Sequence, residues 1–188
     1  MSAGRNMARA RSRGVRFGWI ALALCAATAA ASAPVVDARL EQLPQRWRDD
    51  DGRTLELRTL SGQRVVLTMV YAGCHRFCPI TMARLQHMQM VLDARGQRAD
   101  FVVIGYEPEA EMPADWHSYR AGHHLERRNW HFLSGSRADT ERLARQLGFD
   151  FWKYDEHVMH GMRALVFDER GAVQAQLGPE TQDWAEAL

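Results

Sequence analysis

Two cysteines separated by three residues are the most reactive side chains in this sequence. Cys74 and Cys78 follow an apolar run at 65–71, and Pro79 comes directly after the second cysteine. Proline suits the first turn of a helix, because its fixed φ is helical and an N–H group there has no helical acceptor. A thiol at the start of a helix has a lowered pKa, and the thiolate is the form that attacks disulfides and binds soft metals. The pattern therefore predicts a redox-active or metal-binding pair on a strand-to-helix loop.

The elements around this loop follow from the spacing of the apolar residues. Residues 65–71 are β-branched and aromatic and lie between turn residues, as expected of a buried central strand, and apolar residues recur at helical spacing over 82–92. Further strands are expected at 54–57, 101–106, 130–133, 164–167 and 172–177, helices at 113–125 and 139–147, and short helices within 35–47 and at the C-terminus. A turn at 49–52 between extended segments predicts an N-terminal β-hairpin extension. Together these elements predict an α/β fold, with a central mixed β-sheet flanked by helices.

The first 33 residues have the pattern of a targeting segment. Five arginines and no acidic residue occupy 1–16, and an apolar run at 17–25 leads into an alanine-rich stretch. This order is typical of a secretory signal, and the run is shorter than the about 20 residues of a membrane span. We therefore interpret 1–33 as a signal peptide, or alternatively an N-terminal membrane anchor, and 34–188 as one folded domain. The expected location is the bacterial periplasm or the outer face of the inner membrane. A membrane tether is an open alternative.

Removing this segment changes the charge and the cysteine count of the protein. The whole chain has a net charge of +1, and subtracting the five arginines of 1–33 leaves −4 for residues 34–188. Without a basic stripe, nucleic acid is not an expected partner. Cys74 and Cys78 are then the remaining cysteines, and a disulfide between them closes a loop too small to add much stability. A redox or metal role is favoured over an ordinary local disulfide.

Three histidines are candidates to complete a metal site with the two thiols. His75 lies inside the cysteine loop. His157 and His160 could share a helix-like turn, and of these two only His160 lies next to the strand at 164–167. Two thiolates and one imidazole form a soft ligand set that suits Cu(I), and Cu(II) with an added ligand. Structural zinc would require a fourth protein ligand. The residue types therefore favour copper over zinc.

The order of these motifs resembles the Sco/SenC copper-chaperone branch of the thioredoxin-like fold, over residues 46 to about 178. The resemblance lies in the segments DDDGRTLELRTLSGQRVVLTMVYAGCHRFCP, FVVIGYEPE, WHFLSG and HGMRALVFDERGAV. Its most specific part is a C-x3-C-P motif with a lone histidine eleven residues before a hairpin glycine, here Cys74, Cys78, His160 and Gly171. The resemblance implies that the two thiols and the imidazole bind one copper ion.

The same resemblance implies a biological role. Family members assist assembly of the binuclear copper site of cytochrome c oxidase, so the oxidase subunit carrying that site is an expected partner, together with thiol–disulfide reductants. The sequence departs from the family at two places, with Met159 before the histidine and Glu107 before Pro108, where the family has Asp. The resemblance thus indicates a divergent member, with Glu107 expected as a carboxylate at the rim of the site.

Other side chains near the motif are expected to be structural. Met82 and Met88 share an apolar helix face and are predicted to lie in the core. Met159 and Met162 flank His160, and packing is favoured for both over a thioether contact to copper. Two adjacent histidines are expected at a polar helix end, with a second metal contact as the minor alternative, namely His123 and His124.

A thiol–disulfide oxidoreductase is the rival prediction from the same cysteines. Cys74 would be the nucleophile and Cys78 the resolving thiol. Redox thioredoxins separate their cysteines by two residues, and they place a cis-proline opposite them, where this chain has Arg163. Both features favour the copper chaperone, and enzymatic activity stays an open alternative.

Overall fold

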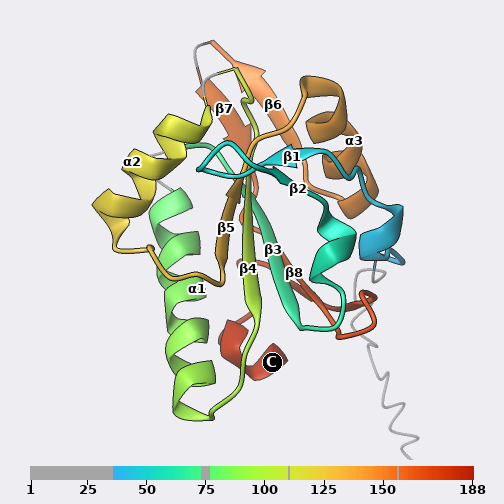
Figure 1. The fold of residues 1–188 in the computed structure, drawn as a ribbon, viewed down its shortest axis with the longest axis vertical. Coiled ribbons are helices and arrows are strands. Elements are labelled where there is room, and N and C mark those ends of the chain that lie inside the picture. The colour runs from blue at the N-terminus through green and yellow to red at the C-terminus, as the bar shows by residue number, and fades with distance from the viewer. Residues whose placement is uncertain (1–35, 73–76, 110, 156) are drawn as a thin grey trace, which may run out of the picture. The chain divides into compact units, whose positions relative to one another are not determined.

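A five-stranded mixed sheet, in the order β5-β4-β3-β8-β9, lies at the centre of the fold (Figure 1). The computed structural model describes residues 36–72, 77–109, 111–155 and 157–188, without the side chains of 77 and 78. The parallel strands are β3 (Val65–Val70), β4 (Asp100–Gly105) and β5 (Trp130–Leu133), and the antiparallel ones are β8 (Ala164–Phe167) and β9 (Val173–Leu177). All residues of β3, β4 and β8 are buried, because both faces of the sheet are covered.

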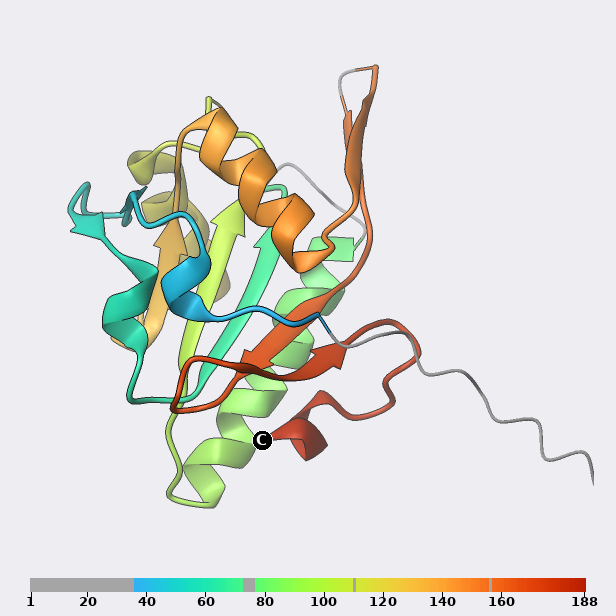
Figure 2. The same ribbon diagram turned by 90° about the vertical axis from the view of Figure 1, so that its right-hand side faces the viewer.

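Helices cover both faces of this sheet (Figures 1 and 2). The helix α1 (Phe77–Ala94) packs Leu85 and its apolar neighbours into one core cluster, which also contains Trp116 of α2 (Pro113–His123). The helix α3 (Arg137–Leu147) packs Leu143 and Leu147 into a second cluster on the other face. Successive residues of β3 and β4 belong to opposite clusters, as the alternation of a strand requires. The predicted α/β fold with a central mixed sheet is confirmed.

The N-terminal extension is a short hairpin, as predicted. β1 (Trp47–Arg48) pairs antiparallel with β2 (Thr54–Leu55), and the Asp49 side chain accepts the backbone N–H groups of Asp51 and Arg53 in the turn. The strand expected at 54–57 is shorter than predicted, because the chain turns into a 3-10 helix that buries Leu57. The 3-10 helices are η1 (Leu40–Gln42), η2 (Leu57–Leu60) and η3 (Trp184–Ala187).

Local signals account for most helix ends. The Ser136 hydroxyl accepts the Asp139 N–H at the start of α3, and Gly148 ends this helix with a φ of 66°. The expected helix at 113–125 ends two residues early at His123. Pro79 is the third residue of α1, still in the first turn. In the described part of the chain, no helix combines the length and the apolarity that a membrane span requires.

A second hairpin, β6–β7, was not predicted from the sequence. β6 (Phe151–Tyr154) pairs antiparallel with β7 (His157–His160), so the helix-like turn expected for the two histidines is wrong. Residues three apart on a strand point to opposite sides. His157 is accordingly exposed, and His160 is buried. The sequence signal was weak because most side chains of this hairpin face solvent.

Candidate metal centre

The strand that leads to the cysteines ends at the carboxyl edge of the parallel sheet. β3 and β4 are parallel and in register from Val65–Asp100 to Val70–Gly105, so their carboxyl ends lie together. Beyond β3 the chain passes through Ala72 towards Cys74, which lies outside the described residues, as does His75. The backbone of Cys78 lies in the first turn of α1. This position at the positive end of an 18-residue helix favours the thiolate form of a cysteine.

His160 lies at the end of β7 and is only 8% exposed. Its Nδ1 is 3.0 Å from the carbonyl oxygen of Gly161, and its ring centroid is 5.0 Å from that of Tyr106. The Tyr106 ring also packs against Phe151, at 4.8 Å. When Nδ1 donates its hydrogen to the carbonyl, the Nε2 atom carries the lone pair that can bind a metal. The histidine is therefore oriented by a backbone acceptor on one side and an aromatic ring on the other.

Two hydrogen bonds connect the surroundings of His160 to the strand that leads to the cysteines. The N–H of Tyr106 donates to the carbonyl of Val70 at 2.9 Å. The hydroxyl of Thr68 donates to the carbonyl of Arg163 at 2.6 Å, and β8 pairs antiparallel with β3 from Ala164 onward. The strand at 164–167 therefore runs beside the strand that leads to the cysteines. The chain between β7 and β8 thus lies along the carboxyl half of β3.

Arg163 stands in the loop position at which redox thioredoxins have a cis-proline. Its guanidinium lies 6.0 Å from the ring centroid of Phe149 and donates to the side chain of Gln176. Its peptide bond is trans, as are those of the other described residues. The side chain of Arg163 thus connects the loop before β8 with Phe149 and with Gln176 of β9.

The other candidate histidines have different surroundings from His160. His157 is on the opposite side of β7 from His160, next to exposed side chains of the hairpin. His123 ends α2, with its ring 4.3 Å from that of Tyr119, and His124 is the residue after it, with a φ of 56°. The carbonyl of His123 accepts the side chain of Gln86, near the middle of α1. Of the two histidines of β7, the structure therefore buries only His160, beside the end of β4 at Tyr106.

The methionines near the motif differ in their surroundings. Met82 and Met88 are buried in the core between α1 and the sheet, which confirms their prediction. Met162 is partly buried against the same cluster. Met159 is 40% exposed, so its predicted packing is wrong, because it shares the outer side of the hairpin with His157.

Glu111 is the residue of this edge that sequence reasoning missed. Its side chain is buried, and its two carboxylate oxygens accept the N–H groups of Ala72 at 2.6 Å and of Glu107 at 2.8 Å. Burial raises its pKa to about 7, against the opposing effect of the two hydrogen bonds, and the carboxylates of Glu107 and Asp115 raise it further. No local signal distinguishes Glu111 from its neighbours, because the segment Glu107–Glu111 resembles an exposed acidic loop.

Glu107 lies beside this buried carboxylate and contacts the second hairpin. Its Oε1 is 2.5 Å from the Nζ atom of Lys153 on β6, and its side chain is 13% exposed. The ion pair connects the end of β4 with the hairpin that carries His160. Glu107 is thus a partly buried carboxylate with its own cationic partner.

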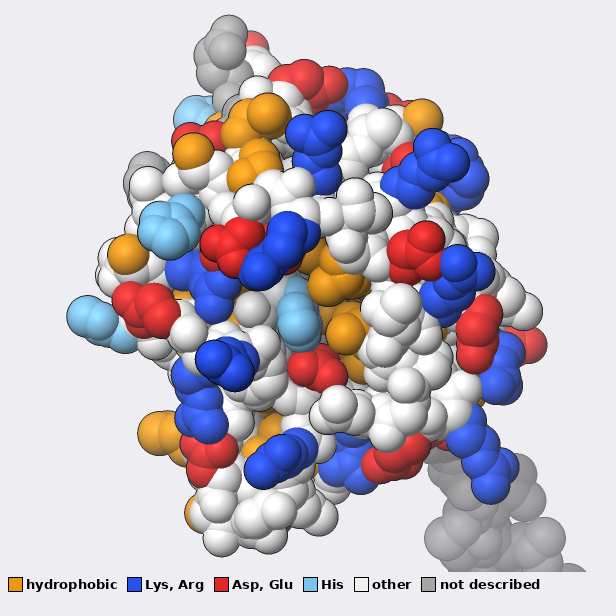
Figure 3. All heavy atoms as spheres, viewed as in Figure 1, with side chains coloured by type: hydrophobic (Ala, Val, Ile, Leu, Met, Phe, Trp, Pro, Cys, Tyr) orange, Lys and Arg blue, Asp and Glu red, His pale blue; other side chains and the backbone are white. Residues whose placement is uncertain are grey.

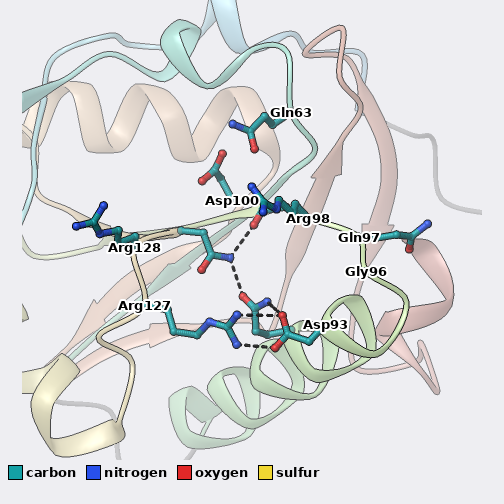
Figure 4. Close-up of a pocket in the computed structure, with 11 residues that line it drawn as sticks. Gln63, Asp93, Gly96, Gln97, Arg98, Asp100, Arg127 and Arg128 are labelled. Atoms are coloured by element: carbon teal, nitrogen blue, oxygen red, sulfur yellow. Dashed lines mark hydrogen bonds and ion pairs between the residues drawn. The ribbon is translucent and has the colours of Figure 1, made fainter.

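Two other polar clusters are less suited to metal chemistry. Asp50, Asp51 and His117 bring ligand atoms within 4.8 Å of one another, but Arg120 and Arg53 already neutralise the two carboxylates. The pocket in Figure 4, of about 710 Å³, lies at the amino edge of the sheet near the start of β4.

On the face shown in Figure 3, cationic and anionic side chains are interspersed.

Comparisons with known proteins agree with this architecture. The family model SCO1/SenC matches residues 40–187. The SCO1 protein homolog of Bacillus subtilis (strain 168) is 26% identical over 133 residues, which cover 70% of this chain and 68% of that protein.

Two solved structures show the same fold. The structure of Arabidopsis thaliana ScoI with copper bound has a TM-score of 0.67 and 18% identity, covering 78% of this chain and 90% of that one. The structure of BsSco has a TM-score of 0.70 and 20% identity, covering 82% of this chain and 91% of that one. BsSco is described as having a disulfide switch and as a member of the Sco family of cytochrome c oxidase assembly proteins. The predicted thioredoxin-like fold is confirmed. Because the family model spans most of the sequence, from η1 to η3, this chain belongs to the SCO1/SenC family.

Proposed function

We propose that this protein is a copper chaperone that holds one copper ion through Cys74, Cys78 and His160. The observation that carries the proposal is the buried imidazole of His160 at the sheet edge where β3 leads towards the cysteines. Family membership supports it, as does the copper found in Arabidopsis thaliana ScoI. Copper is in this reading the cargo of the protein rather than a resident cofactor.

The donor atoms suit this metal. Two thiolates and one imidazole nitrogen are soft and borderline ligands, which favour Cu(I), and an additional ligand would accommodate Cu(II). With Nδ1 bonded to the Gly161 carbonyl, Nε2 would be the nitrogen that binds copper. The helix start at Cys78 supports thiolate formation.

The recipient and the location follow from the family and from the N-terminal segment. The proposed recipient is the cytochrome c oxidase subunit with the binuclear copper site, consistent with the description of BsSco as an oxidase assembly protein. The arginine-rich start and apolar run of residues 1–33 support export to the periplasm or the outer face of the inner membrane, with a cleaved signal or a retained anchor. Thiol–disulfide reductants would keep the cysteine pair able to bind Cu(I).

A Cu(I) competition titration of the reduced protein tests the proposal. His160→Ala should weaken copper affinity by more than about tenfold, because one of three ligands is lost. His157→Ala is the matched control, since this histidine is on the opposite side of the same strand, and it should leave the affinity unchanged. Unaltered stoichiometry and affinity in Cys74→Ser would contradict the assignment.

A thiol–disulfide oxidoreductase is the second candidate, favoured by the position of Cys78 in the first turn of α1. In this reading Cys74 attacks a substrate disulfide and Cys78 resolves the mixed disulfide. An insulin-reduction assay separates the two functions. Efficient turnover together with unchanged copper affinity in His160→Ala would favour the enzyme and reject the chaperone.

A further inference from the structure

Glu111 joins the carboxyl ends of three neighbouring parallel strands. Its carboxylate accepts the N–H group of Ala72, just beyond β3, and that of Glu107, just beyond β4. Its own carbonyl accepts the hydroxyl of Ser134, the residue that follows β5. Ser134 in turn accepts the indole N–H of Trp116 at 2.8 Å. One buried residue thus fixes the exit points of β3, β4 and β5.

Gly105 at the end of β4 provides the space for this carboxylate. A Cβ atom at Gly105 would overlap the carboxylate of Glu111 and approach Cζ2 of Trp116 to 2.9 Å. Any side chain larger than hydrogen would therefore displace Glu111 from the two N–H groups. The glycine and the glutamate therefore depend on each other, although they are six positions apart in the sequence.

The hydrogen bonds of Glu111 use both of its carboxyl oxygens as acceptors. Both of its oxygens accept a backbone N–H group, and glutamine has only one acceptor oxygen. In a glutamine variant, an amide NH2 group would face one of the two N–H donors and leave it unpaired. Because burying an acidic group is costly, the interaction with Ala72 and Glu107 has to offset part of its desolvation.

We propose that Glu111 is a positioning residue for the cysteine pair. By holding the N–H group of Ala72, two residues before Cys74, it sets the direction in which the chain leaves β3. The inference rests on the proposed function, in which Cys74 has to reach the same copper ion as Cys78 and His160. Releasing Ala72 widens the distribution of Cys74 relative to Cys78, which lowers their effective concentration for each other. Both copper binding and disulfide formation should then weaken.

The experiment compares Glu111→Gln and Gly105→Ala with wild type and with Glu109→Gln. Glu109 is the matched control, because it lies in the same loop but is exposed and pairs with Arg137. Cu(I) affinity and the equilibrium of the cysteine pair with glutathione are measured at pH 8, where Glu111 is ionised. Amide hydrogen exchange at 25 °C verifies that each variant is folded. Gly105→Ala provides a second route to the same displacement if Glu111→Gln fails to fold.

We expect Glu111→Gln to weaken Cu(I) affinity by about tenfold and to lower the equilibrium constant for disulfide formation by about threefold or more. Gly105→Ala should shift both quantities in the same direction, and Glu109→Gln should shift neither. A folded Glu111→Gln protein with the wild-type disulfide equilibrium would overturn the inference, because a purely structural residue changes only stability. Absence of copper binding in wild type would refute the proposed function, while the disulfide equilibrium would still decide on Glu111.

Discussion

The two edges of the central sheet contain carboxylates that respond in opposite ways to their surroundings. At the carboxyl edge, burial raises the pKa of Glu111 to about 7, and its partners are neutral backbone N–H groups. At the amino edge, Asp93 accepts two hydrogen bonds from Arg127, at 2.5 and 2.9 Å, and this arginine lowers the pKa of Asp93 (Figure 4). A solvated carboxylate with a cationic partner is stable as an anion, whereas a buried one without such a partner keeps its proton to higher pH.

This difference is consistent with the proposed copper site at the carboxyl edge. The amino edge balances charge in the Asp93–Arg127 pair, whose two side chains are each about half exposed. The carboxyl edge instead buries the Glu111 carboxylate against the chain segment that leads to the cysteines, and His160 nearby is only 8% exposed. Polar groups that are buried at a cost to stability are more typical of functional sites than exposed ion pairs. The following predictions test this contrast, from the largest expected effect to the smallest.

The free energy of unfolding should depend on pH through Glu111. Its pKa is 4.5 when unfolded and about 7 when folded, so the folded state binds more protons between these values. Stability should therefore fall as the pH rises through this window, by roughly 3 kcal/mol for a shift of this size. Urea unfolding of wild type and Glu111→Gln at pH 4.5 and pH 8 measures the difference. Equal pH dependence in both proteins would mean that Glu111 titrates normally.

Removing the hydroxyl that supports Glu111 should have a smaller effect. Ser134→Ala leaves the carbonyl of Glu111 and the indole N–H of Trp116 without the partner they share. An unsatisfied buried polar group costs about 1–3 kcal/mol, which should appear as a lower urea midpoint with an unchanged slope. Ser136→Ala, at the exposed start of α3, controls for loss of a hydroxyl that only caps a helix. A Ser134→Ala midpoint equal to that of wild type would show that water replaces the hydroxyl.

Breaking the exposed pair at the amino edge should have the smallest effect. Asp93→Asn removes the charge that pairs with Arg127, but both side chains are about half exposed. We expect the melting temperature to change by no more than about 2 °C and the copper affinity to stay at the wild-type value. Calorimetry at low and high salt measures the first quantity. A weaker copper site in Asp93→Asn would contradict the assignment of function to the opposite edge.

Sequence patterns predicted the parts of the molecule whose signals are local. The buried strands around Val66 and Val166 were recognised because their apolar runs reflect coverage on both faces. The preference for His160 over His157 came mainly from the family spacing, and the two histidines now lie on opposite sides of β7. The coordination by Cys74, Cys78 and His160 stays a prediction, since Cys74 and the side chain of Cys78 lie outside the described part of the structure.

Features that depend on distant contacts could not be predicted in this way. Glu111 is buried because Gly105 leaves space and because Ala72 and Ser134 bring partners from other strands. Its neighbours in sequence are acidic and suggest an exposed loop. The β6–β7 hairpin was missed for the opposite reason, since its outer residues are exposed and its inner ones pack on Tyr106.

The hairpin that carries His160 also has consequences for fluorescence. Of the five tryptophans in the described residues, Trp152 on β6 is 56% exposed, whereas each of the others is at most 2% exposed. An aqueous quencher such as iodide should therefore reduce the emission of Trp152 more than that of the other four described tryptophans. Trp152 pairs with Met159, the residue before His160, so its emission reports on the strand that holds the imidazole. The native protein thus contains an optical probe beside the proposed metal ligand, without any added label.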